Sequence, residues 1–384
     1  ASDASSLASH IARRPILLVL DNCEHLLDEC AVFIDDILDS GSEATVLTTS
    51  REPHGIDGEI VVPLGSLHGA APELFVLRAR AASPGVDIAV SDERVVQLCR
   101  RLDGLPLAVE LAAAQLAHLG LDDLIARLDA RLELSQRGRS RGGGRHLTLD
   151  RTIAWSYDLL DPDGQWLLRQ FGVFPGSFDL DAAEAVGHRQ DWSTILPSLS
   201  DLVSKSLLTR DEATGRYRLL ETIRAFAEQR LTAAGGHDEA AERLRSHVVR
   251  RATALTRVER WFSGHNAESL RADLDNVRFA FDRSIWSGHA VDALELHIGC
   301  CFLFRNTQSC VDGLRWMARL ESAELDFEPL DLLWCELVRA DVAQGTADHE
   351  MGARAAAHAV ELAASAGDSA AEVIARQSDA LQYV

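Results

Sequence analysis

Asp21 and Asn22 stand at the end of a short apolar segment, and their types point to nucleotide chemistry. Five apolar residues, Ile16–Leu20, precede them without a polar break. Such a run predicts a strand that is buried on both faces, as in a parallel sheet. Open α/β sheets bind ligands at the carboxyl ends of their strands, where a carboxylate can hold Mg²⁺ beside a nucleotide. Asp21 is therefore the first candidate, although a strand-end acid can also simply cap the next helix.

A nucleotide site of this kind also needs a phosphate-binding loop, G-x-x-x-x-G-K-[ST], which this sequence lacks. Its single lysine, Lys205, lies in "DLVSKSLLTR", away from any glycine-rich turn. The chain starts with Ala1, and its methionines are Met317 and Met351. We therefore expect a fragment of a longer protein, with the phosphate-binding loop upstream of Ala1.

The composition is that of a globular protein with several domains. The 384 residues are 47% hydrophobic and 25% charged, which suits about two to four domains. A formal net charge of −21 argues against broad binding to nucleic acid or to acidic membranes. The seven cysteines include no C-x-x-C pair, which fits buried thiols in a reducing cytosol. Without a signal peptide or a long apolar segment, we expect a cytoplasmic protein with no membrane partner.

The first part of the chain, residues 1–68, is predicted to be part of an α/β domain. Apolar residues at helical spacing follow Asp21 over His25–Asp39. Further strands are expected at Ala44–Thr49 and Glu59–Leu64. Strands that alternate with a helical crossover predict a mostly parallel sheet.

A small helical domain is predicted over residues 69–136. Ser91 is the expected N-cap of its second helix, and a proline opens the third, where its missing N–H does no harm. Gly/Arg-rich residues 137–146 are the predicted linker. The four expected helices lie in "APELFVLRARAA", "SDERVVQLCRRLDG", "GLPLAVELAAAQLAHLG" and "LDDLIARLDARLEL".

A winged-helix pattern covers residues 147–235, where helices precede a two-stranded hairpin and a further helix. The first two helices flank an expected Pro162-Asp163-Gly164 turn, and the hairpin turns at Thr214-Gly215. Residues 236–384 are alanine-rich and helical throughout. The fold class expected for the whole chain is α/β followed by all-α.

The last part of the chain resembles a helical repeat. "CVDGLRWMARLESA" and "EMGARAAAHAVELAASAGD" look like copies of one helix, with Arg315 and Arg354 39 residues apart. Stacked helical repeats form a solenoid with a concave binding face. Five tryptophans at helix-packing positions are expected in the core rather than in a ligand site: Trp155, Trp166, Trp261, Trp286 and Trp316.

Five motifs occur in an order typical of one class of protein. They are "LLVLDNCEHLLDE", "VLTTSREPHG", "CRRLDGLPLAVELAAA", "TIAWSYDLL" and "GRYRLLETIRAFAEQRL". Over residues 13–232 the chain resembles the large bacterial LuxR- or SARP-type regulators that carry an NB-ARC-like STAND ATPase module. The helical tail resembles their TPR-like repeats more loosely.

The resemblance implies that Asp21 is the Walker B carboxylate, which holds Mg²⁺ through water. Asn22 stands where many ATPases place a second acid, and an amide cannot accept a proton from water. Fast hydrolysis is therefore not expected unless Glu24 substitutes. We expect at most a slow ATPase in the full-length protein, and no independent ATPase activity from this chain.

Two further segments are implied to contact ATP or ADP. Arg51 matches the sensor arginine that reads the γ-phosphate, with hydroxyl contacts from Thr49 and Ser50. The GLPL motif matches a segment whose proline lies against the adenine; its residues are Gly104, Leu105, Pro106 and Leu107.

One departure from the pattern concerns the winged helix. Related eukaryotic members place a Met-His-Asp triplet there, whose histidine touches the β-phosphate of ADP. Here the corresponding residues are Leu219-Leu220-Glu221, and leucine cannot donate to a phosphate. That contact would fall to Arg218 or Arg224.

These observations favour a nucleotide-dependent signalling switch within a transcriptional regulator. The TPR-like repeats would bind a protein or small-molecule inducer, and a ligand-induced oligomer is compatible with the class. DNA would be bound only by an effector domain outside this chain. The alternative is a helical-repeat protein-binding scaffold with a vestigial ATPase half. A winged helix that reads DNA itself is disfavoured, because "SLSDLVSKSLL" carries one lysine and no arginine.

Overall fold

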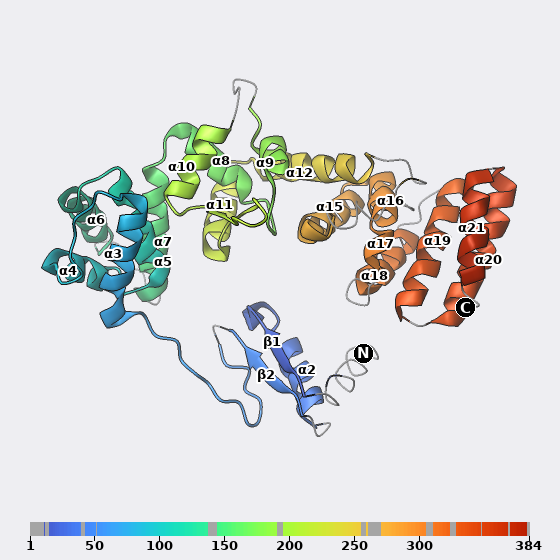
Figure 1. Ribbon diagram of the computed structural model, residues 1–384, viewed down its shortest axis with the longest axis horizontal. Coiled ribbons are helices and arrows are strands. Elements are labelled where there is room, and N and C mark those ends of the chain that lie inside the picture. The colour runs from blue at the N-terminus through green and yellow to red at the C-terminus, as the bar shows by residue number, and fades with distance from the viewer. Residues whose placement is uncertain are drawn as a thin grey trace. The chain divides into compact units, whose positions relative to one another are not determined.

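The computed structural model describes residues 11, 15–39, 43–50, 52–136, 144–189, 195–254, 259, 270–304, 310–322, 328–346, 348–367 and 369–381. The chain divides into two compact units, Ala1–Gly65 and Ser66–Val384 (Figure 1). Each unit is described by itself.

In its described residues, the first unit contains a two-stranded parallel sheet with the helix Leu27–Asp39 beside it (Figure 1). The strands pair from Leu17 opposite Thr45 to Leu20 opposite Thr48, which confirms the expected parallel β-α-β order. Ile34 and Ile37 of the helix are buried. The elements are β1 (Leu17–Leu20), the 3-10 turn η1 (Cys23–His25), α2 (Leu27–Asp39) and β2 (Thr45–Thr48).

Two expectations for this sheet are wrong. The first strand is not buried on both faces, because Leu17 is 62% exposed and Val19 is 54% exposed. The expected strand Glu59–Leu64 is not formed, and its side chains Ile60 and Leu64 are exposed. A strand needs a neighbour for its backbone hydrogen bonds, and none of the described residues pairs with this segment.

The second unit begins with a helical layer around its own apolar core. That core includes Phe75, Leu98 and Leu124, all of which are buried. Asp92, not Ser91, caps α4, because its side chain accepts a hydrogen bond from the Arg94 amide. The elements are η2 (His68–Ala70), α3 (Ala71–Ala82), α4 (Glu93–Arg101), α5 (Pro106–Ala114), η3 (Gln115–Ala117) and α6 (Leu121–Gln136).

The predicted winged-helix elements follow, with the hairpin where the sequence places it. Residues 137–143 of the expected linker lie outside the described residues, and Gly144 begins α7. The expected Pro162-Asp163-Gly164 turn is instead the first turn of α8, which Asp161 caps. The elements are α7 (Gly144–Asp158), α8 (Pro162–Phe171), α9 (Leu180–Gly187), α10 (Leu196–Ser204), β3 (Thr209–Arg210), β4 (Tyr217–Arg218) and α11 (Glu221–Ala233).

Aromatic side chains hold the hairpin to these helices. The rings of Phe174 and Phe178 stack with their centroids 4.0 Å apart. Phe178 and Tyr217 exchange both backbone hydrogen bonds, at 2.9 and 2.7 Å. Gly172 lets α8 end against α11, since a Cβ there would lie 2.5 Å from the Glu228 nitrogen.

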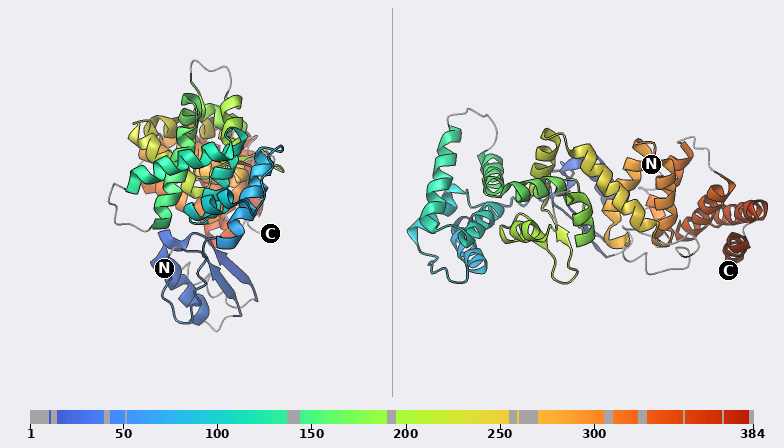
Figure 2. Two further views of the ribbon diagram at one scale, coloured as in Figure 1. Left: turned by 90° about the vertical axis from the view of Figure 1, so that its left-hand side faces the viewer. Right: turned by 90° about the horizontal axis from the view of Figure 1, so that it is seen from above.

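The tail is helical, and successive helices pack on their neighbours, as its orange-to-red part shows in Figure 2. One apolar core runs from the winged helix into this tail.

Trp316 stacks on Phe281 in that core, whereas Trp286 is 74% exposed and its expected burial is wrong. Trp155 is also buried, Trp166 is partly buried, and Trp261 lies outside the described residues. The elements are α12 (His237–Ala252), α15 (Leu274–Trp286), α16 (Ala290–Gly299), α17 (Cys301–Phe304), α18 (Cys310–Ser322), α19 (Pro329–Thr346), α20 (His349–Ala366) and α21 (Ser369–Leu381).

His297 is a buried polar side chain in the tail core. It is fully buried beside Phe304 and Trp316, and neither ring nitrogen has a hydrogen-bond partner among the described residues. Burial lowers the pKa of His297 from 6.5 to about 3, with repulsion from Arg339 adding to the effect. The unfolded chain takes up this proton below pH 6.5, but the folded chain does so only near pH 3. Protonation of this ring therefore has no effect on the free energy of unfolding above pH 6.5 and lowers it progressively as the pH falls from 6.5 toward 3.

Replacing His297 with leucine is expected to stabilise the tail. The change removes two unpaired buried nitrogens and should raise the free energy of unfolding by about 1–3 kcal/mol at neutral pH. The difference from the unsubstituted chain should widen as the pH falls toward about 5, because leucine cannot be protonated. Calorimetric unfolding at both pH values measures this. His349→Leu, at an exposed position, is the control, and equal effects of the two variants would contradict the explanation.

Candidate functional site

The carboxyl ends of the two parallel strands bring Asp21, Asn22 and Thr49 together. The Thr49 hydroxyl donates a hydrogen bond to Oδ1 of Asp21. The same hydroxyl oxygen accepts one from the Asn22 backbone N–H at 2.9 Å. Because β1 and β2 are parallel and adjacent, residues that follow each strand meet at one edge of the sheet. This part of the predicted site is a real cluster.

The backbone after Asp21 turns sharply to reach this arrangement. Asn22 has φ 62° and ψ 43°, in the left-handed region, which asparagine tolerates better than most residues. The turn lets the Cys23 N–H donate to the Thr49 carbonyl at 2.9 Å, while the Thr49 N–H donates to the Leu20 carbonyl at 2.9 Å. The strand-end cluster (Asp21, Asn22 and Thr49) is thus fixed by backbone as well as side-chain bonds.

The other candidates of this unit are less tightly placed. Ser50 accepts a hydrogen bond from the Glu52 N–H at 3.3 Å and does not contact Asp21. Glu24 is half-buried in η1. Arg51, the expected γ-phosphate sensor, lies outside the described residues.

The GLPL motif has the backbone that its sequence predicts. Gly104 has φ 60°, and its carbonyl accepts a hydrogen bond from the Leu67 N–H at 2.9 Å. Pro106 is the first residue of α5 and is exposed, with Leu105 half-buried before it. The motif belongs to the second unit and the strand-end cluster to the first, so their joining into one site stays a prediction.

The two arginines considered for a phosphate contact differ in their ion pairs and in their exposure to water. Arg224 contacts Glu221 at 2.6 Å and Glu228 at 3.0 Å. The hydrogen bond with Glu221 raises the pKa of the Arg224 guanidinium, against the effect of burial. Arg218 is exposed on β4 and is the more accessible of the two, while Leu219 is buried in the core.

The strand-end cluster suits Mg²⁺ only with help from other ligands. Carboxylate and hydroxyl oxygens are the hard donors that Mg²⁺ prefers, and this ion usually keeps waters and phosphate oxygens as well. In the described part of the chain, no three His, Cys, Asp or Glu side chains gather closely enough to hold a metal ion. Asp21 and Thr49 would therefore hold Mg²⁺ together with a nucleotide, not alone.

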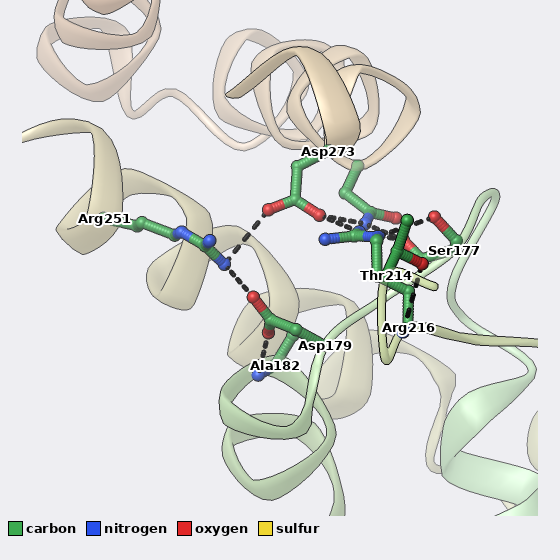
Figure 3. A network of polar contacts seen from close by, with 8 residues as sticks. Ser177, Asp179, Ala182, Thr214, Arg216, Arg251 and Asp273 are labelled. Carbon is green, nitrogen blue, oxygen red and sulfur yellow. Dashed lines mark hydrogen bonds and ion pairs between the residues drawn. The ribbon is translucent and has the colours of Figure 1, made fainter. Parts of the chain in front are cut away.

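A second polar centre joins the winged helix to the tail (Figure 3). Asp273, which precedes α15, lies between two arginines: Arg216 of the hairpin and Arg251 of α12. Arg251 Nη1 lies 3.1 Å from Asp273 Oδ2 and 2.5 Å from Asp179 Oδ2. Arg216 also donates to the Ser177 carbonyl at 2.8 Å. We call these residues the Asp273 network.

Burial gives the Asp273 network its strength. The Asp273 side chain is 7% exposed and that of Arg216 is 12% exposed. Burial works against the charged form of Asp179, but hydrogen bonds from the Ala182 N–H and from Arg251 outweigh it and lower the pKa of this carboxyl. The hairpin is thus held against the tail by charges that water reaches poorly.

The helix in the position of a DNA-recognition helix carries no free cation. The nine residues of α10 include no lysine or arginine. Lys205 follows directly, but its side chain is 9% exposed and its Nζ lies 2.6 Å from Asp201 Oδ1. The electrostatic part of DNA affinity comes from exposed Lys and Arg side chains that neutralise phosphates. This surface does not supply one.

Residues 160–232 match the winged helix-turn-helix domain. The match begins just before α8 and ends in α11, so it covers α8, α9, α10, the hairpin and nearly all of α11, but not α7. This family model agrees with the winged-helix pattern expected from the sequence. No helix in the described residues is long and apolar enough to cross a bilayer.

Most of the chain is similar to mycobacterial proteins. It is 38% identical over 324 residues to a protein of Mycobacterium bovis named "Putative HTH-type transcriptional regulator", and equally to one of Mycobacterium tuberculosis. These matches cover 82% of this chain but 36% of each relative, so the chain spans about a third of the length of these curated relatives. An uncharacterized M. tuberculosis protein is 41% identical over 243 residues, 61% of each chain.

Among solved structures, the chain is similar to a STAND protein with a tetratricopeptide repeat sensor from Pyrococcus horikoshii. The identity is 14% and the TM-score 0.40, over 99% of this chain and 67% of the other. At this TM-score the likeness does not establish a shared fold.

Sequence patterns did not indicate the Asp273 network. Arg216, Arg251 and Asp273 are far apart in the chain, and the motif that contains Arg216 does not indicate an ion pair. Asp179 also belongs to the network through Arg251, and its side chain caps α9.

Replacing Asp273 with alanine is expected to loosen the winged helix from the tail. Arg216 and Arg251 would lose the carboxylate that they share, and Arg216 is nearly buried. The free energy of unfolding should fall by about 3–5 kcal/mol. Thermal unfolding followed by circular dichroism measures the loss.

Asp282→Ala is the matched control on the same helix. Its side chain is 60% exposed and pairs with Arg319 at the surface, so its loss should cost no more than about 1 kcal/mol. Equal destabilisation by the two variants would show that the network has no special role.

Proposed function

We propose that this chain is the switch portion of a bacterial transcriptional regulator that binds ATP or ADP with Mg²⁺. The nucleotide state would control whether an effector domain outside this chain is free to bind DNA. The observation that carries the proposal is the strand-end cluster. In this cluster a carboxylate, a shared hydroxyl and a left-handed turn lie at the carboxyl ends of two parallel strands, the edge at which open α/β sheets bind ligands.

The residues of the strand-end cluster have separate roles in this proposal. Asp21 would hold Mg²⁺, which when bound neutralises charge on the phosphate oxygens. Thr49 orients the Asp21 carboxylate through its hydroxyl and ties it to the Asn22 N–H. Asn22 cannot take a proton from water, so slow hydrolysis and long-lived nucleotide states are expected. Such kinetics suit a switch.

The open face of the first unit supports a larger α/β domain. Leu17, Val19 and Leu47 are each more than half exposed on one face of the sheet. Parallel sheets are normally covered on both faces, and apolar patches of this kind mark contact surfaces. We propose that a helix of the same nucleotide-binding domain covers this face.

The helical tail supports a sensor role. Gly313 and Gly352, 39 residues apart, are both buried, and a Cβ at Gly313 would lie 2.7 Å from Val342. Trp316 and Ala355 repeat the same spacing and are buried. Arg315 and Arg354 are both exposed. This shared pattern supports TPR-like repeats, whose exposed side would bind the protein or small-molecule inducer.

The similarity to HTH-type regulators supports the transcriptional part of the proposal. It also favours a second candidate, in which the matched winged helix itself reads DNA. The charge of α10 argues against that candidate, since Lys205 is bound by Asp201 and no other cation lies on the helix. We therefore place DNA binding in another domain of the full-length protein.

The nucleotide proposal predicts that the full-length protein retains nucleotide after purification. Denaturation followed by chromatography should release close to one ADP or ATP per chain. Asp21→Ala should abolish retention. Thr49→Val should weaken Mg²⁺-dependent affinity by about 10- to 100-fold, because it removes the group that orients the ligand carboxylate.

Asp39→Ala is the charge-matched control, since Asp39 is exposed at the far end of α2. It should retain nucleotide as the parent does. A parent protein that contains no nucleotide and takes up none with Mg²⁺ would leave the scaffold alternative standing.

The DNA proposal predicts that this chain does not bind duplex DNA directly. Fluorescence anisotropy with a labelled duplex of mixed sequence should show no binding at about 10⁻⁶ to 10⁻⁴ M, where non-specific binding is usual. Salt-sensitive binding that is lost on Arg210→Ala or Arg218→Ala, two changes in the hairpin, would instead favour the winged helix as the DNA reader.

A further inference from the structure

A groove lies between α9 of the winged helix and α12, the first helix of the tail. The two helices run antiparallel. Arg251, in the last turn of α12, pairs with Asp179 just before α9 at 2.5 Å. About two turns earlier in α12, Arg243 donates to the Val186 carbonyl near the end of α9 at 2.9 Å. The groove along this pair of helices has a volume of about 600 Å³, within the range of about 300–1,000 Å³ that is usual for small-molecule pockets.

Small side chains leave the space between the two helices open. Ala185 of α9 and Ser246 of α12 line the groove from opposite sides, and both are half-buried. On the other side of each helix, Val186 and Val248 are buried in the common apolar core. The core therefore fixes the distance between the helices, and the groove exists without a ligand.

Two of the charged side chains that line the groove are already neutralised. Glu242 pairs with Arg245 at 2.5 Å, and Arg243 pairs with Glu239 at 2.6 Å. His247 adds no charge at neutral pH, because burial lowers its pKa below the ordinary value of 6.5. None of these side chains needs a ligand to balance its charge.

Three other charged side chains of the groove are unpaired. Asp181 and Glu184, one turn apart on α9, are exposed, and neither carboxylate has a hydrogen-bond or ion-pair partner among the described residues. Arg250 of α12 is exposed as well, and its guanidinium pairs with no side chain in the same part of the structure. One wall of the groove therefore carries two negative charges, and the other carries one positive charge.

We propose that this groove binds a basic amino acid, a molecule with two cationic groups and one carboxylate. The cationic groups would contact Asp181 and Glu184. The carboxylate would contact Arg250, whose planar guanidinium can donate two parallel hydrogen bonds to it. Each unpaired charge of the groove then meets one opposite charge of the ligand. The groove is larger than such a ligand, and bridging waters fill the remaining space at little cost.

A ligand in the groove would contact the winged helix and the tail together. Binding to the packed form alone stabilises that form by mass action. It would therefore strengthen the same junction that Asp179 and Arg251 hold in the Asp273 network (Figure 3). This binding needs no nucleotide, and an effect on the switch would follow only if the proposed function is also right.

Isothermal titration calorimetry of the whole chain with L-lysine, without nucleotide, tests the proposal. At about pH 8 histidine side chains are normally uncharged, so the titration reports the acids and Arg250. We expect saturable binding with a Kd of about 1 mM or tighter. Cadaverine, which is lysine without its carboxylate, should bind about fivefold more weakly. No saturable binding of L-lysine or L-arginine would overturn the proposal, as would equal affinities for L-lysine and cadaverine.

Substitutions in the groove locate the binding site. Asp181→Asn and Glu184→Gln should each weaken L-lysine binding by about fivefold. Arg250→Gln should weaken it by a similar factor and should also remove the difference between L-lysine and cadaverine. Ala185→Met fills the groove without changing a charge and should abolish binding. Unchanged affinity in these four variants would place the site elsewhere and overturn the proposal.

Two charge-matched controls lie outside the groove. Glu361→Gln on α20 and Arg315→Gln on α18 remove one exposed charge each from the tail, and both variants should bind L-lysine as the unsubstituted chain does. Weakening by these controls as large as that by the groove variants would show a general effect of net charge and would contradict a specific site. A full-length protein without nucleotide, but with normal L-lysine binding, would count against the proposed function only.

Discussion

The carboxylate of Asp273 fixes how the winged helix packs on the tail. It precedes α15 in the tail, yet it is shared by Arg216 of the hairpin and Arg251 of α12. Arg251 in turn pairs with Asp179, which caps α9 of the winged helix. Three parts of the chain therefore meet at one acid. Because the apolar core also continues from the winged helix into the tail, the two cannot be treated as independent domains.

The sequence predicted the helices and strands more reliably than it predicted which of their side chains are buried and which strands pair. The helix over Ala71–Ala82 and the hairpin after α10 follow directly from apolar spacing and turn residues. The burial of β1 and the strand at residues 59–64 did not follow, because both depend on neighbours that local sequence cannot supply. The predicted burial of Trp286 failed for a related reason. Its ring is exposed, and the Arg283 guanidinium lies over it, 4.7 Å from the ring centroid. Residue type alone does not distinguish a packed ring from one at the surface.

The candidate site was predictable in part for the same physical reason. Asp21 and Thr49 each end a parallel strand, so the topology alone brings them to one edge of the sheet. The role of the Thr49 hydroxyl as a bridge between Asp21 and Asn22 requires coordinates, since it depends on the left-handed backbone at Asn22. The Asp273 network could not have been found by pattern, because ion pairs between distant segments leave no periodic signal.

Buried ion pairs such as those of the Asp273 network add little net energy against opening of the interface in a switch. Removing one partner leaves an unpaired buried charge and is costly, but opening the interface returns every partner to water. The net energy that the ions add against opening is therefore small, and the apolar core that runs from the winged helix into the tail supplies most of the resistance. What the ions do add is selectivity, since any other docking of the hairpin would bury Arg216 or Asp273 without its partner. A ligand that binds the tail could then shift the equilibrium between the closed and the open interface if its affinities for the two states differ modestly. The ion pairs would still allow only one closed arrangement.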